Sequence, residues 1–184
     1  LTEASIPRQR SSNPWQDLVD GLRYIRTDRV VLGLLFLALV PLVFAMPYMS
    51  LLPIFAADVF GMDARGLGEL LTATGVGAIA STLVVASLGS FRGKGMLLVG
   101  SGAALGVSLV LFAVSTYYPL SLAMLALVGL FSMAYLALTN TLLTLATPRE
   151  YLGRVMSIYM LDRGLIPLGS FAAGAIPEML NAPW

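Results

Sequence analysis

The stretch LSLAMLALVGLFSMAYLALTNTLLTLA, residues 120–146, carries no charged side chain in 27 positions. It lies inside a longer charge-free stretch that runs from Gly95 to Pro148. As an α-helix, these residues would extend about 40 Å, which exceeds the ~30 Å hydrocarbon core of a bilayer. A backbone in lipid has to satisfy its own hydrogen bonds, and a helix does so within one segment. Residues 120–146 are therefore predicted to form a membrane-spanning helix.

The same pattern recurs along the chain, because the charges are gathered into short clusters. None lies between Arg29 and Asp58, or between Glu69 and Arg92. The chain is 58% hydrophobic and 11% charged, against roughly 25% charged in an ordinary soluble domain. The composition therefore predicts an all-α polytopic membrane protein with five spans, at about residues 30–57, 67–88, 96–115, 120–146 and 153–180.

The chain begins with a polar segment, residues 1–13, that is typical of a linker. Asn13-Pro14 then has the pattern of a helix N-cap followed by proline at the first helical position. Up to Arg29, the apolar residues gather on one helix face: Trp15, Leu18, Val19, Leu22 and Ile25. Residues 1–29 are therefore predicted to be a linker and an amphipathic helix at the membrane surface, with residues 30–184 forming the transmembrane part. The alternative is a first turn that continues straight into the next helix.

The first span contains three prolines, Pro41, Pro47 and Pro53. As a single helix it would exceed ~40 Å, so we expect kinks or tilt within it. Small residues also recur four positions apart, at Gly77 and Ser81 in the second span and at Gly102 and Gly106 in the third. That spacing predicts close helix packing; the alternative is that these residues flank a transport pathway.

The placement of lysine and arginine predicts the orientation. With the N-terminal segment on the cytoplasmic side, alternation of the spans puts nine of the 11 basic residues inside: Arg8, Arg10, Arg23, Arg26, Arg29, Arg92, Lys94, Arg149 and Arg154. Only Arg65 falls outside, and only Arg163 falls within a span. This distribution follows the positive-inside rule. Tyr117, Tyr118 and Trp184 then lie near the outer interface.

The residue content excludes several classes of function. The chain has no cysteine and no histidine, so it lacks a thiolate nucleophile and the commonest metal ligand and general base. No nucleophile elbow, zinc-protease motif or phosphate-binding glycine loop occurs. We therefore expect no enzyme activity, no cofactor, no metal and no nucleic-acid partner.

Two polar residues of the spans are candidates for a substrate pathway or for ion coupling. Asn140 lies in the inner half of its span with threonines around it. Because an amide facing lipid is costly, it is predicted to form an interhelical hydrogen bond or to contact a transported molecule. Glu69 lies at the outer start of the second span, where it is either an ordinary partner of the helix dipole or a coupling carboxylate.

Asp162 and Arg163 are the only acid–base pair inside a predicted span. Adjacent helical residues point about 100° apart, so the two side chains are expected to meet different partners. For Arg163 three interpretations remain open. They are snorkelling to the headgroups, an ion pair with another helix or loop, and direct binding of substrate or protons.

One stretch resembles a known family. Residues PREYLGRVMS, from Pro148 to Ser157, followed by GLIPLGS from Gly164, resemble the tenth-to-eleventh helix region of major facilitator superfamily transporters. The closest likeness is to the bacterial branch that contains enterobactin exporters and macrolide efflux proteins. The lead-in DLVDGLRYI, residues 17–25, resembles the end of that branch's central cytoplasmic loop. The resemblance implies that the five spans are helices 7–11 of twelve, with the first six and the last absent.

The resemblance also implies a cytoplasmic gate. In this superfamily an acidic-basic loop motif docks near the inner end of the eleventh helix, so Asp162 or Arg163 is expected to meet a partner in the absent N-terminal half. Arg149, Gly153 and Arg154 belong to the matching stretch. The loop GSFRGKG, residues 89–95, resembles a degenerate copy of the motif; it keeps Arg92 and Lys94 but has Ser90 where aspartate is expected.

The function implied by the resemblance is secondary transport by alternating access. The expected activity is export of a small amphipathic molecule, drug-like or siderophore-like, by proton antiport across a bacterial inner membrane. The expected partners are the lipid bilayer, a small-molecule substrate, protons and the N-terminal half of the same chain. The alternative is a non-transporting membrane scaffold or assembly partner.

Overall fold

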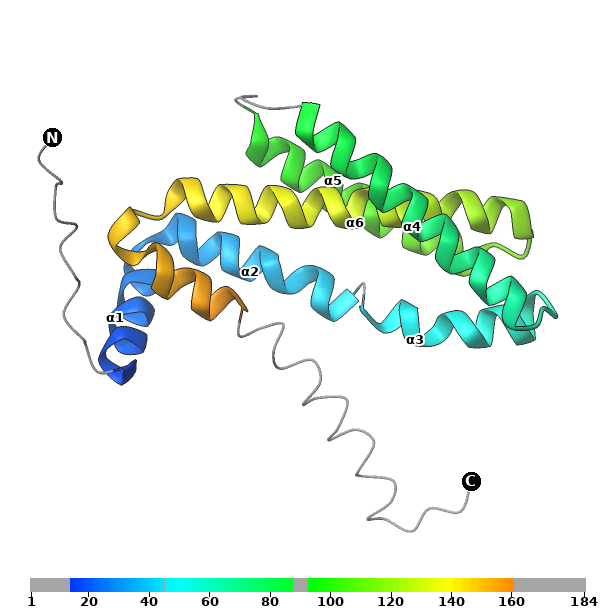
Figure 1. The fold of residues 1–184 in the computed structure, drawn as a ribbon, viewed down its shortest axis with the longest axis horizontal. Coiled ribbons are helices and arrows are strands. Elements are labelled where there is room, and N and C mark those ends of the chain that lie inside the picture. The colour runs from blue at the N-terminus through cyan, green and yellow to red at the C-terminus, as the bar shows by residue number, and fades with distance from the viewer. Residues whose placement is uncertain (1–13, 45, 88–92, 161–184) are drawn as a thin grey trace, which may run out of the picture. The chain divides into compact units, whose positions relative to one another are not determined.

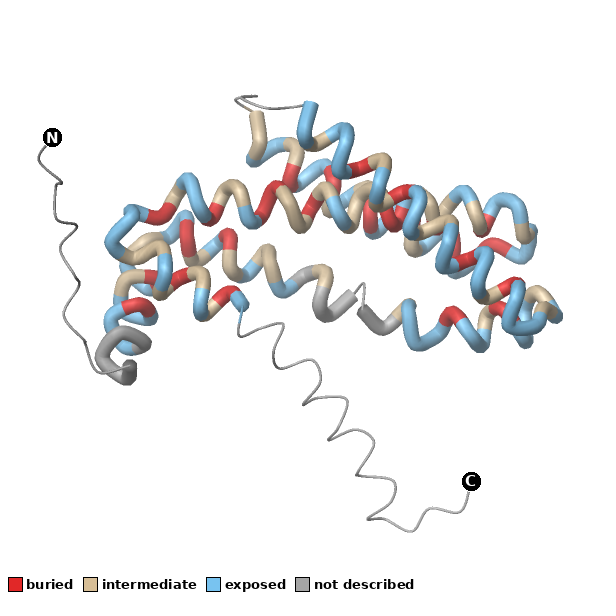
Figure 2. The backbone as a smooth tube through the Cα atoms, viewed as in Figure 1, coloured by how far each residue is buried: buried red, intermediate tan, exposed pale blue. Residues whose placement is uncertain are grey.

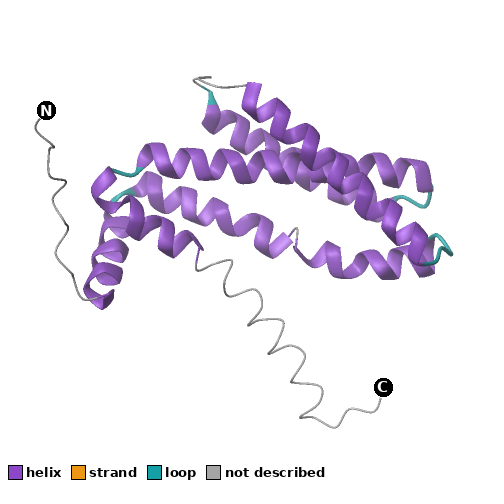
Figure 3. Cartoon of the chain, in the orientation of Figure 1, coloured by secondary structure: helices purple, strands orange, loops and turns teal. Residues whose placement is uncertain are grey.

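A computed structural model describes residues 14–44, 46–87 and 93–160 of the chain. Every regular element in these residues is a helix (Figure 3). The chain divides into two compact units, one made of residues 1–33 and 147–184 and the other of residues 34–146. The predicted all-α fold is confirmed for the described residues.

The helices, labelled in Figure 1, are α1 (Pro14–Thr27), α2 (Arg29–Phe44), α3 (Met46–Ile54), the π-helix η1 (Phe55–Val59), α4 (Ala64–Ser87), α5 (Lys94–Val114) and α6 (Tyr118–Ala146). A further helix occupies residues 149–160. Within the described residues, three helices are long and apolar enough to cross a membrane, namely α4, α5 and α6. The 29 residues of α6 extend about 43 Å at ~1.5 Å per residue.

The region predicted as one kinked span, residues 30–57, is helical at every described residue: α2 and α3 lie on either side of residue 45, and η1 follows α3 directly. Two of its prolines lie within these helices, Pro41 in α2 and Pro53 in α3, and each lacks the N–H that the helical ladder needs. A π-turn follows Pro53, in which the Phe60 N–H donates to the Phe55 carbonyl at 3.1 Å. Gly61, with φ of 61°, then ends the helix in a conformation that favours glycine.

In the unit of residues 34–146, α4 and α6 touch through two glycines. A Cβ on Gly77 would collide with the Ala126 carbonyl, and a Cβ on Gly129 would collide with the Thr74 carbonyl. Both glycines are buried. The backbones therefore approach more closely than any larger side chain would allow, as expected for helices that pack in lipid.

The buried face of α5 follows a regular spacing of three and four residues: Leu98, Ser101, Leu105, Ser108 and Phe112. This spacing produces a narrow seam along one side of a helix. Gly102 lies beside the seam, where a Cβ would come within 2.8 Å of the Tyr135 ring of α6. None of the described residues packs against Gly106, which is exposed.

A tyrosine on α6 compensates for the proline in α2. In an unbroken helix the residue at position 41 would donate its N–H to the carbonyl of Leu37, but Pro41 has no N–H. The Tyr135 hydroxyl donates to that carbonyl instead, at 2.6 Å. Tyr135 is 2% exposed, so this bond satisfies a backbone group that has lost its helical donor.

Large apolar side chains cover much of the outer surface of α4 and α5. Figure 2 shows the buried positions along the sides where helices meet and the exposed positions on the outside. The exposed residues include Ile79 at 66%, Leu83 at 70% and Met96 at 85%. An apolar exterior over a seam of serine and glycine is the arrangement expected of helices surrounded by lipid.

Candidate functional site

In the unit of residues 1–33 and 147–184, α1 packs against the helix of residues 149–160. Gly21 is buried in this contact; a Cβ there would lie 3.1 Å from Cβ of Arg154 and 3.4 Å from Cδ1 of Ile158. Ile25 of α1 and Val155 of the other helix are also buried. We call this pairing the α1 clip and define it by six residues: Asp20, Gly21, Tyr24, Asp28, Tyr151 and Arg154.

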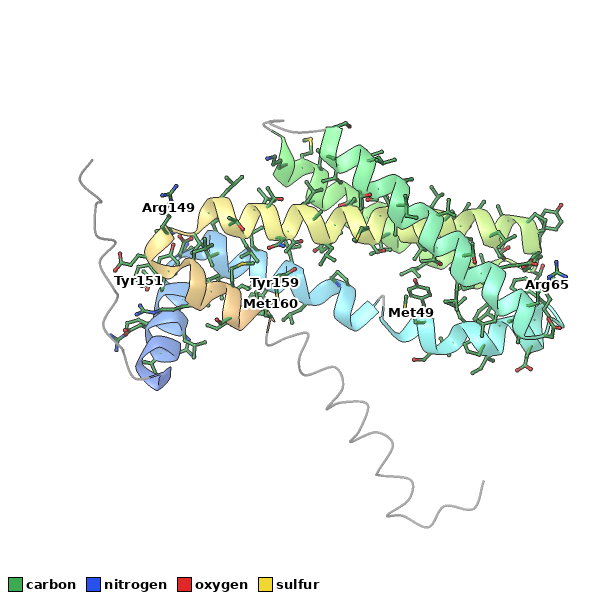
Figure 4. The ribbon with its side chains drawn as sticks, viewed as in Figure 1. Met49, Arg65, Arg149, Tyr151, Tyr159 and Met160 are labelled. Atoms are coloured by element: carbon green, nitrogen blue, oxygen red, sulfur yellow. The ribbon has the colours of Figure 1, made fainter. Side chains whose placement is uncertain are left out.

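An aromatic pair forms the middle of the α1 clip. The rings of Tyr24 and Tyr151 are stacked with their centroids 4.4 Å apart and their planes 4° from parallel. The Tyr24 hydroxyl donates to Oδ2 of Asp28 at 3.1 Å. Partial burial, together with the Asp28 carboxylate, raises the pKa of the Tyr24 hydroxyl. Figure 4 labels Tyr151 in the first turn of its helix.

Asp28 joins the α1 clip to the start of α2. It is the single residue between α1 and α2, and its Oδ1 accepts from the N–H groups of Val30 at 2.9 Å and Val31 at 3.2 Å. The side chain thus caps the α2 N-terminus. The Val31 N–H is the main cause of a lowered pKa of the Asp28 carboxyl, with the Val30 N–H and the Tyr24 hydroxyl adding to it.

Arg154 contributes the charged part of the α1 clip. Its Nη1 lies 4.0 Å from Oδ2 of Asp20, and its guanidinium carbon lies 5.8 Å from the centre of the Tyr151 ring. Distances of this size correspond to an ion pair at the limit of contact and to a cation–π contact. Unlike Arg154, which is half-buried, the neighbouring candidates Arg149 and Gly153 are exposed. No described atom lies close to the Cβ position of Gly153. In Figure 4, Arg149 projects away from the helix.

A second polar cluster lies in the unit of residues 34–146 and contains Glu69. The Tyr118 hydroxyl donates to Oε2 of Glu69 at 2.6 Å, and Nε of Arg65 lies 3.4 Å from Oε1. The Tyr118 and Phe60 rings also pack in a T-shaped arrangement, with their centroids 5.4 Å apart. Glu69 therefore joins the first turns of α4 to the start of α6, while Arg65 is exposed at that end (Figure 4).

Asn140 is exposed on α6, and none of the described residues hydrogen-bonds to its amide. The threonines around it use their hydroxyls locally. Thr139, Thr141 and Thr144 each donate to the carbonyl four residues earlier, at 2.8 Å. Asn140 is therefore the one polar side chain in this described part of α6 that still has a donor and an acceptor to offer.

The other predicted site residues are only partly covered by the structure. Lys94 is the first residue of α5 and is half-buried. Arg92, Asp162 and Arg163 lie outside the described residues, as does most of the predicted span 153–180. The sequence analysis missed Tyr24, Asp28 and Tyr151. Asp28 carried a usable signal, since an aspartate directly before an apolar helix is a common N-cap.

These features define a class of protein: a polytopic helical membrane protein whose described charges lie near helix ends, on α1 and in the α1 clip. The model of the transmembrane secretion effector family matches residues 3–184. The chain therefore belongs to this family of major facilitator superfamily transporters, in the branch that includes the enterobactin exporters, as the sequence predicted. The members of this family are transporters, not enzymes.

Two curated relatives support the assignment. The chain is 32% identical over 124 residues to the staphyloferrin A transporter of Staphylococcus aureus, covering 67% of this chain and 31% of that protein. It is 29% identical over 159 residues to the enterobactin exporter EntS of Shigella flexneri, covering 86% of this chain and 37% of that protein. The chain thus spans about a third of the length of these relatives. No solved structure gives a significant match.

Proposed function

We propose that this chain is the C-terminal part of a secondary transporter that exports a small amphipathic molecule by proton antiport. The observation that carries the proposal is the match of the transporter family across residues 3–184. In this proposal the chain supplies helices 7–11 of twelve, and the N-terminal half of the same protein completes the substrate pathway. Two halves that rock about a central site would provide alternating access.

The names of the relatives favour a siderophore-like substrate. One is described as a staphyloferrin A transporter and the other as an enterobactin exporter. We propose the same broad class here, a small molecule with both polar and apolar surface. Asn140 is the preferred substrate contact among the described residues, since its exposed amide offers a donor and an acceptor at a depth where lipid would offer neither.

The α1 clip fits a cytoplasmic role in this mechanism. Through Asp28 it is bonded to the start of α2, and through Tyr24 and Arg154 it packs on the helix of residues 149–160. Two helices that begin 120 residues apart (29 and 149) are thereby tied to one short helix. We propose that they move together when the cytoplasmic side opens and closes, with the N-terminal end of the chain in the cytoplasm of a bacterial cell.

Glu69 is proposed to be a structural residue of the outer end, because Tyr118 and Arg65 already engage both of its oxygens. The coupling carboxylate is then Asp162 or a residue of the N-terminal half. A charge reversal at Arg163 in the full-length protein tests the gate proposal. Unchanged transport together with unchanged cytoplasmic accessibility would contradict it.

The function is tested by efflux from cells that produce the full-length protein. Cells loaded with a fluorescent siderophore analogue should lose it faster than cells with an empty vector, and a protonophore should abolish the difference. Efflux that continues after the proton gradient collapses would contradict proton antiport. Asn140→Ala then separates transport from the scaffold alternative: transport should fall while the amount of protein in the membrane stays constant.

A further inference from the structure

The side of α1 that faces away from the clip combines apolar and basic residues. Val19 and Leu22 are 51% and 44% exposed, and Arg23 and Arg26 are exposed beside them. Residues three and four apart in a helix lie on one face, so these four side chains form a single surface. The opposite face carries Gly21, Tyr24, Ile25 and Asp28, which are used in the clip or at the α2 cap.

This surface, which we call the basic face, also borders a hollow. Val19, Leu22, Arg23, Arg26 and Thr27 line an open hollow of about 390 Å³. None of the described side chains forms an ion pair with Arg23 or Arg26, and the nearby Asp20 lies 4.0 Å from Arg154. Two guanidinium groups thus border this hollow together with the apolar side chains of Val19 and Leu22.

The position of the basic face points to lipid rather than to a soluble partner. Asp28 is the only residue between α1 and α2, and the apolar sequence of α2 begins immediately, at Val30. A helix so close to a membrane-entering segment lies at headgroup depth, where apolar side chains reach the acyl chains and arginines reach phosphates. Guanidinium groups bind phosphate oxygens in pairs of parallel hydrogen bonds.

We propose that the basic face binds an anionic phospholipid of the cytoplasmic leaflet, with Arg23 and Arg26 on the headgroup phosphate and Val19 and Leu22 against the upper acyl chain. Because the α1 clip ties α1 to the starts of α2 and of the helix 149–160, a bound lipid would hold these helix starts at the membrane surface. The ligand class is a phosphodiester lipid with net negative charge, such as phosphatidylglycerol.

The test is a lipid titration of the purified full-length protein in detergent, with adducts measured by native mass spectrometry. Short-chain phosphatidylglycerol should bind more tightly than short-chain phosphatidylcholine. Arg23→Gln and Arg26→Gln should each weaken phosphatidylglycerol binding about five-fold, and the double variant about 25-fold. The control is Arg65→Gln, which removes one exposed positive charge far along the sequence and should leave the affinity unchanged.

Three results would overturn the proposal. The first is wild-type affinity in the Arg23→Gln/Arg26→Gln variant, which would mean that the lipid binds elsewhere. The second is an equal loss in Arg65→Gln, which would mean that binding responds only to net charge. The third is displacement of the lipid by inorganic phosphate at similar concentration, which would identify a site for the free anion. The readout is lipid binding, so a failure here is distinct from a failure of the transport proposal.

Discussion

At the scale of single residues, several positions are determined by what the backbone needs. Gly77 and Gly129 allow two backbones to touch, Tyr135 donates to a carbonyl left unpaired by Pro41, and Asp28 caps the first turn of α2. In lipid, water does not satisfy an exposed backbone group, so such local solutions matter more than in a soluble protein.

Gly129→Ala should destabilise the full-length protein by about 1–3 kcal/mol, because the new Cβ would displace the Thr74 carbonyl and separate α4 from α6. Thermal unfolding in detergent measures the effect. Gly75→Ala is the matched control: Gly75 is exposed with open space around it, so this change should be neutral or slightly stabilising. Equal melting temperatures for the two variants would contradict the described α4–α6 contact.

Tyr135→Phe should cost about 1 kcal/mol, since the Leu37 carbonyl would lose its donor inside the membrane. The cost should shrink when Pro41→Ala is present, because alanine restores the helical N–H. A double-mutant cycle on unfolding free energies tests this dependence. Equal costs of Tyr135→Phe in the wild-type and Pro41→Ala backgrounds would show that the Tyr135 hydroxyl does not replace the N–H that is missing at Pro41.

Asp28 makes a pH-dependent contribution. Its carboxyl has a folded-state pKa below the ordinary value of 3.8. The ionised Asp28 carboxyl therefore stabilises the folded state at pH values above 3.8. This stabilisation is lost as the pH falls through the lowered folded-state pKa. Asp28→Asn keeps a capping oxygen but does not titrate. The stability difference between the wild type and Asp28→Asn, measured by denaturant unfolding, should be constant near neutral pH and shrink in acid. A stability difference that does not change with pH would contradict a stabilising role of the Asp28 charge at the α2 N-terminus.

At the scale of helices, the α1 clip is the feature that sequence patterns describe least well. An amphipathic α1 was predicted with Val19, Leu22 and Ile25 on one apolar face. In the structure only Ile25 of these three is buried, and the packed face is centred on Gly21 and Tyr24. Hydrophobicity indicates which residues avoid water, but it does not distinguish a face that meets another helix from one that meets lipid.

The stacked tyrosines should couple α1 to the helix of residues 149–160. Tyr24→Leu and Tyr151→Leu should each lower stability, and the double variant should cost about 1 kcal/mol less than the sum of the two. Tyr24→Phe, which keeps the ring and loses the hydroxyl bond to Asp28, is the control and should preserve most of the coupling. Additive costs for the two leucine variants would contradict a direct ring contact.

Much of the helical pattern followed from charge-free stretches, because lipid requires long apolar helices. The predicted spans 67–88, 96–115 and 120–146 overlap α4, α5 and α6. For residues 30–57 only kinking or tilt was predicted, and the prolines did not indicate the π-helix η1 that follows α3. The Tyr118–Glu69 bond joins residues 49 positions apart, and no local pattern predicts such a pair.

At the scale of the whole molecule, the chain has the features of part of a transporter rather than of an enzyme. Its apolar exterior suits lipid, and its described charges lie near helix ends, on α1 and in the α1 clip. Its family is one of major facilitator superfamily transporters.

The most direct measurement of the central claim is flux in proteoliposomes that contain the full-length protein and no other transporter. An imposed pH gradient should drive a siderophore-like substrate against its own concentration gradient, with protons moving in the opposite direction. Asn140→Ala should reduce that flux in vesicles that hold the same amount of protein. Substrate that only equilibrates across the membrane, with or without the pH gradient, would contradict proton-coupled export.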